Sequence, residues 1–413
     1  MNPPTGGNLI ALEWLQFGLG RLLSAAADED LTVHLLTGHR PEYLHELASA
    51  DRSRLVVHDV NTFDVSEVVH TVRRIGDVAG LVSTTDTWSL VALAALRELG
   101  LGGQDPDSVR LVRDKARLRR RLYEHGLSRA DGRPVADTDD ADAVAARTGL
   151  PLIVKDSAGT GSQHVWLART TDELRDVLDL ARNSALRGRP TAEPYFLGPL
   201  YSMETLTWEG STRLLAVSSR VLSPPPLFRE EALALPVALP GCMAEEAGRW
   251  IERVLKAVGY TEGFAHTEFI LTDHGFEVVE INPRLGGGLV GEGLCKALGV
   301  NVYAAFVDLA LRRRPALMDE PLAPLCGAAH ARLYAPRTGV FRGIEGAQLL
   351  AGHPGSPAVR PAMPDGTEVT TVADQDGCVA VVSATGATSE LALQNVVSAA
   401  GELSVRMEGD RRA

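Results

Sequence analysis

Two pairs of polar residues have the types and spacing of a metal and phosphate site. His266 and Glu268 are separated by one residue, and so are Glu280 and Asn282. Because side chains alternate across a strand, the members of each pair share one face if both segments are extended. Carboxylate and amide oxygens suit Mg²⁺, which proteins hold through one or two carboxylates together with substrate phosphates. Arg284 follows shortly after and adds a cation where such phosphates would lie. The spacing therefore predicts a site for ATP and Mg²⁺.

The element that must position these residues is a β-hairpin. Strands are predicted over residues 266–271 and 276–282, joined by the turn-like segment 272–275. The residues that alternate with the polar pairs are mostly apolar and are expected to pack inward; they are Thr267, Phe269, Val279 and Ile281. Both carboxylates and the amide oxygen would then converge from neighbouring strands.

An ordinary hairpin with a solvated polar face is the alternative. This interpretation is weakened because the polar residues cluster at one end and run into a glycine segment, 286–288. A hairpin that is merely solvated needs no glycine run at that point. Gly287 and Gly288 instead suggest that the backbone comes close to a substrate.

The composition is that of a globular chain with several domains. The chain has 413 residues, 45% of them hydrophobic, and a net charge of −12. This length predicts three or four subdomains, and the acidic charge argues against a general nucleic-acid binder. Four widely spaced cysteines form no CxxC pair, so we expect free thiols in a reducing compartment. The first residues lack the features of a signal peptide, and no run approaches the ~20 apolar residues of a membrane span. We therefore expect a cytoplasmic protein that binds neither nucleic acid nor membrane.

The first hundred residues alternate between strand-like and helix-like segments. Strands are predicted over 8–13, 31–37 and 80–83, and a helix over 90–99. Such alternation predicts a parallel sheet covered by helices. A glycine-bearing loop at 17–20 follows the first strand, but the full GxGxxG pattern of a dinucleotide site is absent from it.

A second strand-to-loop segment has the form of a phosphate-binding loop. The apolar strand 151–155 ends in Lys155 and runs into a loop that contains Gly159, Gly161 and Ser162. Loops of this composition bring backbone N–H groups close to phosphate oxygens. The GK[ST] ending of a Walker loop is missing, and a flexible surface turn is the alternative.

Taken together, these residues resemble the metal-binding end of the ATP-grasp superfamily. Glu268, the run Glu280-Ile281-Asn282-Pro283-Arg284 and the glycines at 286–288 carry the resemblance. Within the superfamily, the sequence is most similar to carboxylate–amine ligases of the L-amino-acid ligase type. The similarity extends from about Asn8 to about Asn395, nearly the whole chain.

The resemblance implies an α/β (α+β) ATP-grasp fold with four parts. These are an N-terminal domain with a parallel sheet (1–112), a small ATP-grasp lobe with a glycine-rich lid (113–190), a large lobe with the metal site (191–315) and a strand-rich C-terminal domain (316–413). The last part shows no recognisable catalytic cluster and no Met-Lys-Met type of sequence that would accept biotin.

The resemblance also implies how the phosphates bind. Lys115, on a basic helix predicted over 113–126, and Lys155 would neutralise phosphate charge. The loop after Lys155 would be the mobile lid, which contacts the nucleotide through Gly159, Gly161 and Ser162. Asp156 replaces the proline that commonly follows the strand-end lysine in this superfamily.

The segment 193–204 is similar to the interdomain segment that binds adenine. Glu193 would reach the adenine amino group, and the backbone around Tyr195 and Phe196 would read the ring edge. Leu200 stands where related ligases often place a ribose-binding glutamate, so the ribose has no assigned partner.

The implied reaction is ATP-dependent joining of a carboxylate to an amine. ATP converts the carboxylate into an acyl phosphate, the amine attacks, and ADP and phosphate leave. Glu268, Glu280 and Asn282 would hold two Mg²⁺ ions, or Mn²⁺, that offset the phosphate charge. Arg284 would steady the transferring phosphoryl group, a role that suits a planar guanidinium.

The substrate residues remain open between two roles each. His266 either orients a carboxylate or takes the proton of the amine, and a structural histidine is an equal alternative. Asp86 follows the predicted strand 80–83 and either binds a substrate ammonium or caps the next helix. Glu204 would point towards the phosphates or the substrate.

Other classes of function stay as alternatives. A carboxylase-like enzyme that activates bicarbonate and a D-alanine-ligase-like enzyme keep ATP but change the acceptor. A nucleotide-binding module without turnover belongs to a different class. The expected partners are a small carboxylate, a small amine and a second copy of the chain in a homodimer.

Overall fold

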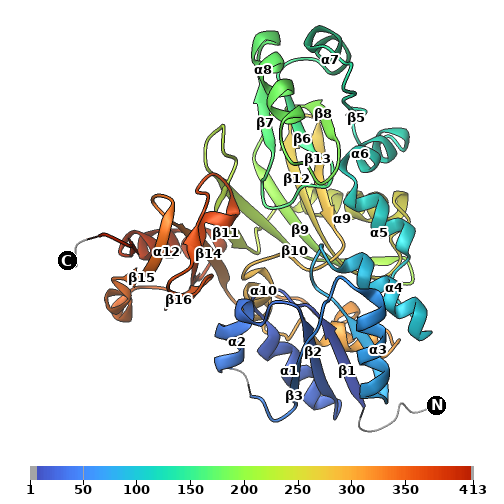
Figure 1. Cartoon of the computed structure of the whole chain (residues 1–413), viewed down its shortest axis with the longest axis vertical. Helices are drawn as coiled ribbons and strands as arrows, with labels where there is room; N and C mark the ends of the chain where they lie inside the picture. Colours follow the sequence, from blue (N-terminus) through green and yellow to red (C-terminus); the bar gives the residue numbers. More distant parts are fainter. Residues whose placement is uncertain (1–6, 50, 411–413) are drawn as a thin grey trace.

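A computed structural model describes residues 7–49 and 51–410 of the protein (Figure 1). The first six residues, to which the expectation about a signal peptide refers, lie outside this range. The blue N-terminal domain lies at the bottom of the view and a small green and teal lobe at the top, with a large sheet between them (Figure 1). Among the described residues, no helix is both long and apolar enough to cross a membrane. The four cysteines are free thiols.

The N-terminal domain contains the predicted parallel sheet. Its strands lie in the order β3-β2-β1-β4, which are Leu55–Asp59, Thr32–Thr37, Asn8–Leu12 and Val78–Val82. Its helices are α1 (Leu19–Asp28), α2 (Leu44–Ser49), α3 (Val65–Ile75) and α4 (Ser89–Leu99). In β1, Leu9 and Ala11 pack into the core that contains α1, and Ile10 and Leu12 into the core that contains α3 and α4. The sheet is thus covered on both faces, as a parallel sheet requires. The half-exposed strand β3 was not predicted.

The small lobe is an antiparallel sheet with helices on one side. Its strands lie in the order β5-β8-β6-β7, which are Arg133–Pro134, Pro190–Pro194, Leu152–Asp156 and Val165–Ala168. Helices α7 (Ala141–Thr148) and α8 (Thr171–Arg182) pack on this sheet, whereas the buried faces of α5 (Pro106–Arg113) and α6 (Lys115–Glu124) belong to a core of the large lobe. The predicted basic helix begins at Lys115, because the side chain of Asp114 accepts hydrogen bonds from the N–H groups of Ala116 and Arg117.

One eight-stranded sheet joins the large lobe to the C-terminal region. Its order is β13-β12-β9-β10-β11-β14-β18-β16, which are Gly275–Asn282, Gly263–Thr272, Leu200–Trp208, Ser211–Leu222, Glu230–Leu235, Gly327–Tyr334, Cys378–Gly386 and Ala358–Pro361. A small sheet of β17 (Glu368–Val369), β15 (Gly339–Glu345) and β19 (Ser404–Met407) lies beyond it. The sheet is therefore continuous across the boundary that the sequence placed at residue 316.

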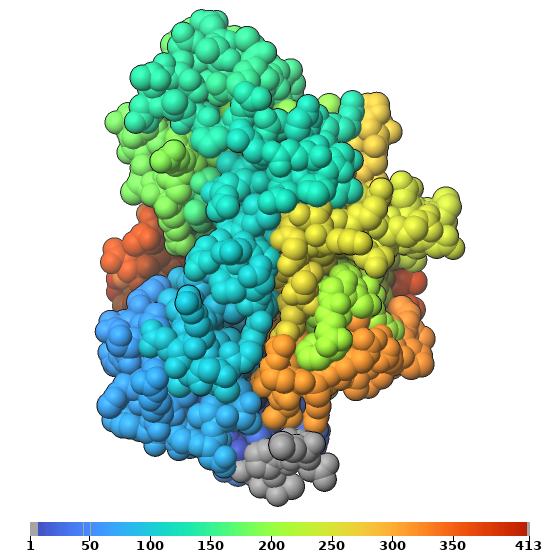
Figure 2. Space-filling model, turned by 90° about the vertical axis from the view of Figure 1, so that its right-hand side faces the viewer, coloured from blue at the N-terminus to red at the C-terminus, as the bar shows by residue number. Residues whose placement is uncertain are grey.

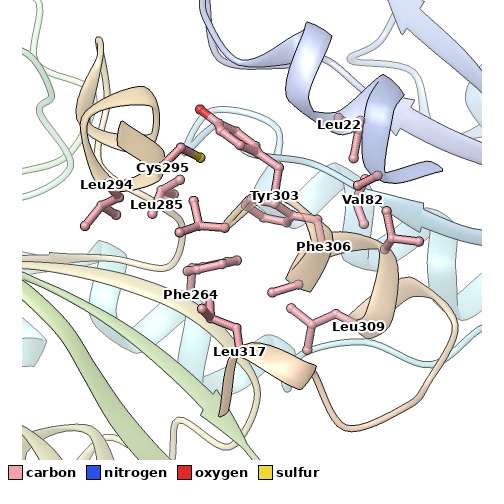
Figure 3. Packing of buried hydrophobic residues seen from close by; sticks show 14 of the residues in the cluster. Leu22, Val82, Phe264, Leu285, Leu294, Cys295, Tyr303, Phe306, Leu309 and Leu317 are labelled. Carbon is pink, nitrogen blue, oxygen red and sulfur yellow. The ribbon is translucent and has the colours of Figure 1, made fainter. Parts of the chain in front are cut away.

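Four further helices pack around the large sheet: α9 (Gly241–Ala257), α10 (Val290–Leu298), α11 (Ala304–Ala310) and α12 (Ser389–Gly401). The small lobe and the N-terminal domain lie at opposite ends of the molecule, and the yellow segment around α9 is exposed between them (Figure 2). Phe264 and Phe306, whose ring centroids are 4.6 Å apart, belong to a buried cluster that includes Leu22 of α1 (Figure 3). This apolar core ties the N-terminal domain to the large sheet.

The predicted hairpin is formed by β12 and β13, with one local difference. His266 pairs with Asn282 and Glu268 with Glu280, but the register shifts at the next position. Phe269 then pairs with Val278, which is buried in the core, and Val279 is the extra residue of a β-bulge. The prediction that Val279 packs inward is therefore wrong.

Candidate functional site

A cavity of about 470 Å³ lies between the small lobe and the large sheet. Ten residues that the sequence assigned to nucleotide or metal line it: Lys115, Lys155, Gly159, Gly161, Ser162, Glu193, Tyr195, Phe196, Glu268 and Glu280. The bulged Val279 also lines it, so the register shift turns an apolar side chain into the cavity. Residues from four separate segments of the chain thus meet in one place.

The two hairpin carboxylates face each other across the strand pair. Like charges in directly opposed positions are unfavourable unless a cation lies between or beside them. Here Lys115 Nζ lies 3.0 Å from Glu280 Oε2, and Arg220 Nη1 lies 3.3 Å from Glu268 Oε1. Asn282 Nδ2 donates to Glu280 Oε1 over 2.9 Å. The paired carboxylates and the neighbouring amide form an oxygen-rich donor set that fits Mg²⁺.

Both carboxylates are ionised at neutral pH. Burial raises the pKa of Glu268, but the nearby Arg220 and other cations outweigh it and lower the pKa to about 2. Burial likewise opposes ionisation of Glu280, and Lys115 reverses this effect, so its pKa is also lowered. A metal ligand must be deprotonated, and these residues satisfy that condition.

Lys155 and Glu193 form a buried ion pair on neighbouring strands β6 and β8. Glu193 also lies 3.3 Å from Arg119 Nε, and Arg119 in turn lies 3.3 Å from Glu277. Lys155 and Glu193 are only 4% and 5% exposed. Burial lowers the pKa of Lys155, although Glu193 opposes this shift. Both oxygens of Glu193 are engaged by these cations, so its contact with adenine stays a proposal.

Asp156 anchors the base of the glycine-rich loop. It is buried, and its carboxylate accepts hydrogen bonds from the N–H groups of Ala158, Arg187 and Gly188 over 2.7–3.0 Å. Lys115 Nζ donates to the carbonyl of Gly159 over 2.6 Å. Asp156 stands where proline commonly follows the strand-end lysine, and its hydrogen bonds fix the base of the loop.

Beyond the hairpin, Glu204 and His266 support the glycine run. Glu204 is fully buried; its Oε2 accepts from the N–H of Gly286 over 2.9 Å, and its Oε1 contacts His266 Nδ1. His266 Nε2 lies 2.9 Å from Arg220 Nη2. Arginine can only donate, so Nε2 accepts and Nδ1 carries the proton that points to Glu204. Both ring nitrogens of His266 thus have partners within the protein, and Glu204 holds the loop.

The residues of the glycine run lie close to several charged groups. A Cβ at Gly286 would lie 2.9 Å from both Glu204 Oε1 and His266 Nδ1, so this position requires glycine. Gly287 lies beside Arg284, and Gly288 adopts a φ of +60° near Arg332. Arg284 itself is paired with Asp86 of the N-terminal domain. Trp88, and not Asp86, is the N-cap residue of α4; the carbonyl of Asp86 accepts from the N–H of Ser89, and its carboxylate contacts Arg284.

The cavity residues that the sequence did not assign include Arg220, Phe228, Glu230 and Gln375, and Arg332 contacts Glu230 behind them. Glu230 is 2% exposed and accepts from Arg332 Nε over 2.9 Å while it pairs with Arg220. Arg332 lies on β14, so the C-terminal region contributes one contact to the residues that line the cavity. Pairing of β11 with β14 brings residues about a hundred positions apart together. An arginine on a strand carries no motif that would reveal such a contact.

Comparison with known proteins agrees with this architecture. The L-arginine-specific L-amino acid ligase of Bacillus subtilis is 22% identical over 309 residues, which cover 72% of this chain and 73% of that protein. Human carnosine synthase 1 is 23% identical over 324 residues, 72% of this chain and 39% of that protein. The crystal structure of an L-amino acid ligase from Bacillus licheniformis superposes with a TM-score of 0.81 at 18% identity, and the match covers 98% of this chain and all of that one.

Two models of known families match the sequence directly. The model described as ATP-grasp domain matches residues 148–292, which include the lid loop and the metal hairpin. The chain therefore contains an ATP-grasp domain, and its expected fold is confirmed. The model described as L-amino acid ligase C-terminal domain 2 matches residues 331–408. With this domain and these relatives, the chain is an ATP-grasp ligase, an enzyme that forms C–N bonds with consumption of ATP.

Proposed function

We propose that the protein joins the carboxylate of an amino acid or small acid to an amine through an acyl phosphate, with release of ADP and phosphate. One observation carries this proposal. Two lysines and the two ionised carboxylates of the hairpin line one cavity. Arg284 follows in the loop directly after the second hairpin strand, β13. This order of charges suits transfer of the terminal phosphoryl group.

In this proposal the cavity binds ATP. Lys115 and Lys155 lie at its wall and neutralise phosphate charge, and the rings of Tyr195 and Phe228, 6.3 Å apart, flank the base. Glu268, Glu280 and Asn282 would hold two Mg²⁺ ions, which would offset the charge of the phosphates and make phosphorus easier to attack. Lys115, which pairs with Glu280 in the structure, would then contact phosphate oxygens.

The carboxylate substrate then lies between the hairpin and the glycine run. Arg284 stabilises the charge that develops as a carboxylate oxygen attacks the γ-phosphorus, and the bond to ADP breaks. The backbone of Gly287 and Gly288 borders the acyl phosphate. The amine nitrogen attacks the acyl carbon, the C–N bond forms, and phosphate leaves with the bond electrons.

The amine must be unprotonated when it attacks. Asp86 Oδ1 is a buried oxygen that accepts no hydrogen bond from the described part of the chain. We assign it to the incoming ammonium, which it orients beside Arg284; the ammonium loses one proton to solvent before attack, and the leaving phosphate takes the second as the C–N bond forms. His266 is not assigned a proton-transfer role, because both ring nitrogens have partners.

Amino acids are the proposed substrates because of the relatives. The Bacillus subtilis relative is named as an L-arginine-specific L-amino acid ligase, and the human relative as a carnosine synthase. Both names concern amino-acid ligation, and the C-terminal family model carries the same description. We also propose a homodimer, which sedimentation of the purified protein tests.

The nucleotide product and a trapped intermediate test the reaction. Wild-type protein is incubated with Mg²⁺, ATP, a panel of amino acids and hydroxylamine, which converts an activated carboxylate to a hydroxamate. We expect hydroxamate with ADP as the nucleotide product, and loss of both in Arg284→Ala. Production of AMP contradicts the acyl phosphate. Saturable ATP binding without turnover on any carboxylate supports a binding module instead, and turnover with bicarbonate alone supports a carboxylase.

A further inference from the structure

A short segment of the C-terminal region reaches the mouth of the nucleotide cavity. Residues 371–377, which we name the C-terminal latch, connect β17 to β18 and contain the 3₁₀ turn Gln375–Gly377. Gln375 lines the cavity together with the lid loop. It is therefore a wall residue supplied by neither the small nor the large ATP-grasp lobe.

The latch contacts the lid directly. Gln163 Nε2 donates to Asp376 Oδ2 over 2.7 Å, and the N–H of Gln375 points at the carbonyl of Gly161 over 3.4 Å. Gln163 and Gly161 also line the cavity. The contact therefore joins two segments 213 residues apart in sequence across the rim of the cavity.

The latch is also fixed to the opposite rim. Arg229 donates to the carbonyl of Val372, and its guanidinium lies 3.7 Å above the ring of Tyr334. Arg229 ends the loop 223–229, whose Ser223, Pro224, Pro225 and Phe228 line the cavity. Because Tyr334 belongs to β14, the latch is anchored to the large sheet while it holds the lid.

The character of these contacts suits a reversible closure. The bond between Gln163 and Asp376 is one exposed hydrogen bond between side chains, and the net contribution of one such bond to the stability of a fold is small. The same bond must break whenever the lid moves away from the cavity. This hydrogen bond is therefore expected to affect mainly the rate at which the lid opens, a step that limits product release in many enzymes.

We propose that the C-terminal latch holds the glycine-rich lid closed over the nucleotide and so slows the release of ADP. This inference rests on the proposed nucleotide site and adds a role for the C-terminal region in it. Gln163 and Asp376 act as positioning residues: they act on the nucleotide through the lid.

Release of a fluorescent ADP analogue tests the latch. Mant-ADP with Mg²⁺ is bound to the full-length protein and displaced with excess ATP in a stopped-flow instrument. Gln163→Ala and Asp376→Ala are each expected to speed release about fivefold, the effect of one hydrogen bond. The double variant is expected to release no faster than either single variant, because both changes remove the same bond. Asp376→Asn keeps an acceptor oxygen and is expected to release at nearly the wild-type rate.

Controls separate the latch from general effects. Asp365→Ala removes an exposed carboxylate of the same region that pairs with Arg342, and is expected to leave release unchanged. Melting temperatures of all variants are expected to match the wild type. Unchanged release in both single variants, or additive effects in the double variant, overturns the latch while the nucleotide site stands. A wild-type protein that does not bind mant-ADP overturns the nucleotide site and the latch with it.

Discussion

Asp86 Oδ2 accepts a hydrogen bond from Nε of Arg284 over 2.7 Å and forms an ion pair with its Nη2 at 2.5 Å, although 198 residues separate the two. The other oxygen of Asp86 is buried and accepts none from the described residues. Arg113 donates to the carbonyl of Asp86 and so holds the loop that carries this carboxylate. The N-terminal domain therefore determines where the guanidinium of Arg284 points.

Substitution of Asp86 is expected to slow turnover without weakening nucleotide binding. Asp86→Asn keeps the shape but loses the charge that orients Arg284, and Asp86 does not line the nucleotide cavity. We expect kcat to fall about 100-fold, the effect of misplacing a catalytic group. Phosphate release and mant-ADP titration measure the two effects. A large loss of ADP affinity with unchanged kcat contradicts this role.

Glu280→Gln is expected to reduce turnover by about 100-fold or more, because the metal loses a charged ligand at the point where phosphate charge must be offset. The hairpin is expected to form normally, since glutamine has the same shape. Turnover against Mg²⁺ concentration and far-UV circular dichroism provide the measurement. Asp273→Asn in the exposed turn of the same hairpin is the matched control, with wild-type turnover expected. Wild-type kcat in Glu280→Gln would remove Glu280 from the metal site.

The paired carboxylates could be found from sequence because their partners are local. A hairpin brings residues 268 and 280 together through a short turn, and alternation alone gives the face on which they lie. Lys155, at the end of the strand before the lid, and the glycine run 286–288 are recognisable for the same reason. Each belongs to one continuous segment whose residue types report its own conformation.

The rest of the site depends on contacts between distant segments. Arg220 and Arg332 meet at Glu230 only because β10, β11 and β14 are neighbours in the sheet. Residue types along one strand do not reveal which strand will lie beside it. The bulge at Val279 was missed for a related reason. One extra residue changes the side of the sheet to which a side chain points, and no distinctive sequence marks it.

Glu193→Gln is expected to destabilise the protein by about 3 kcal/mol, because it leaves Lys155 and Arg119 as buried cations with one partner fewer. Burial alone would raise the pKa of Glu193, but Lys155 and Arg119 outweigh burial and lower this pKa below its ordinary 4.5. A lowered pKa in the folded state adds stability above pH 4.5 and loses it as the pH falls through the folded value. The difference in the free energy of unfolding between the wild type and Glu193→Gln is therefore expected to stay constant around neutral pH. It is expected to become smaller below pH 4.5.

Urea unfolding of the wild type and of Glu193→Gln between pH 3 and 7 measures this difference in the free energy of unfolding. Glu246→Gln, on the exposed side of α9, is the control and is expected to stay at wild-type stability throughout. A gap that is equally large at acid pH would show that shape rather than charge makes Glu193 important.

Gly286→Ala is expected to reduce both turnover and melting temperature. The added methyl group would lie 2.8 Å from Val290 Cγ1 and 2.9 Å from Glu204 and His266, so the glycine run must move away from the hairpin. Gly248→Ala in α9 is the matched control, because a Cβ there meets no described atom within 4 Å. Alanine favours a helix interior, so this control is expected to gain about 0.5 kcal/mol of stability. Thermal melting and phosphate release compare the two variants.

The position of β14 between β11 and β18 restricts how this enzyme can be rebuilt. A chain cut near residue 320 would leave β11 with unpaired backbone groups, and an exposed edge of this kind invites aggregation. It would also remove Arg332 from Glu230. A chimaera that exchanges C-terminal regions between related ligases therefore needs its crossover point outside the strands of the large sheet, and it must match the pairing register of β11 as well as the chemistry of the site.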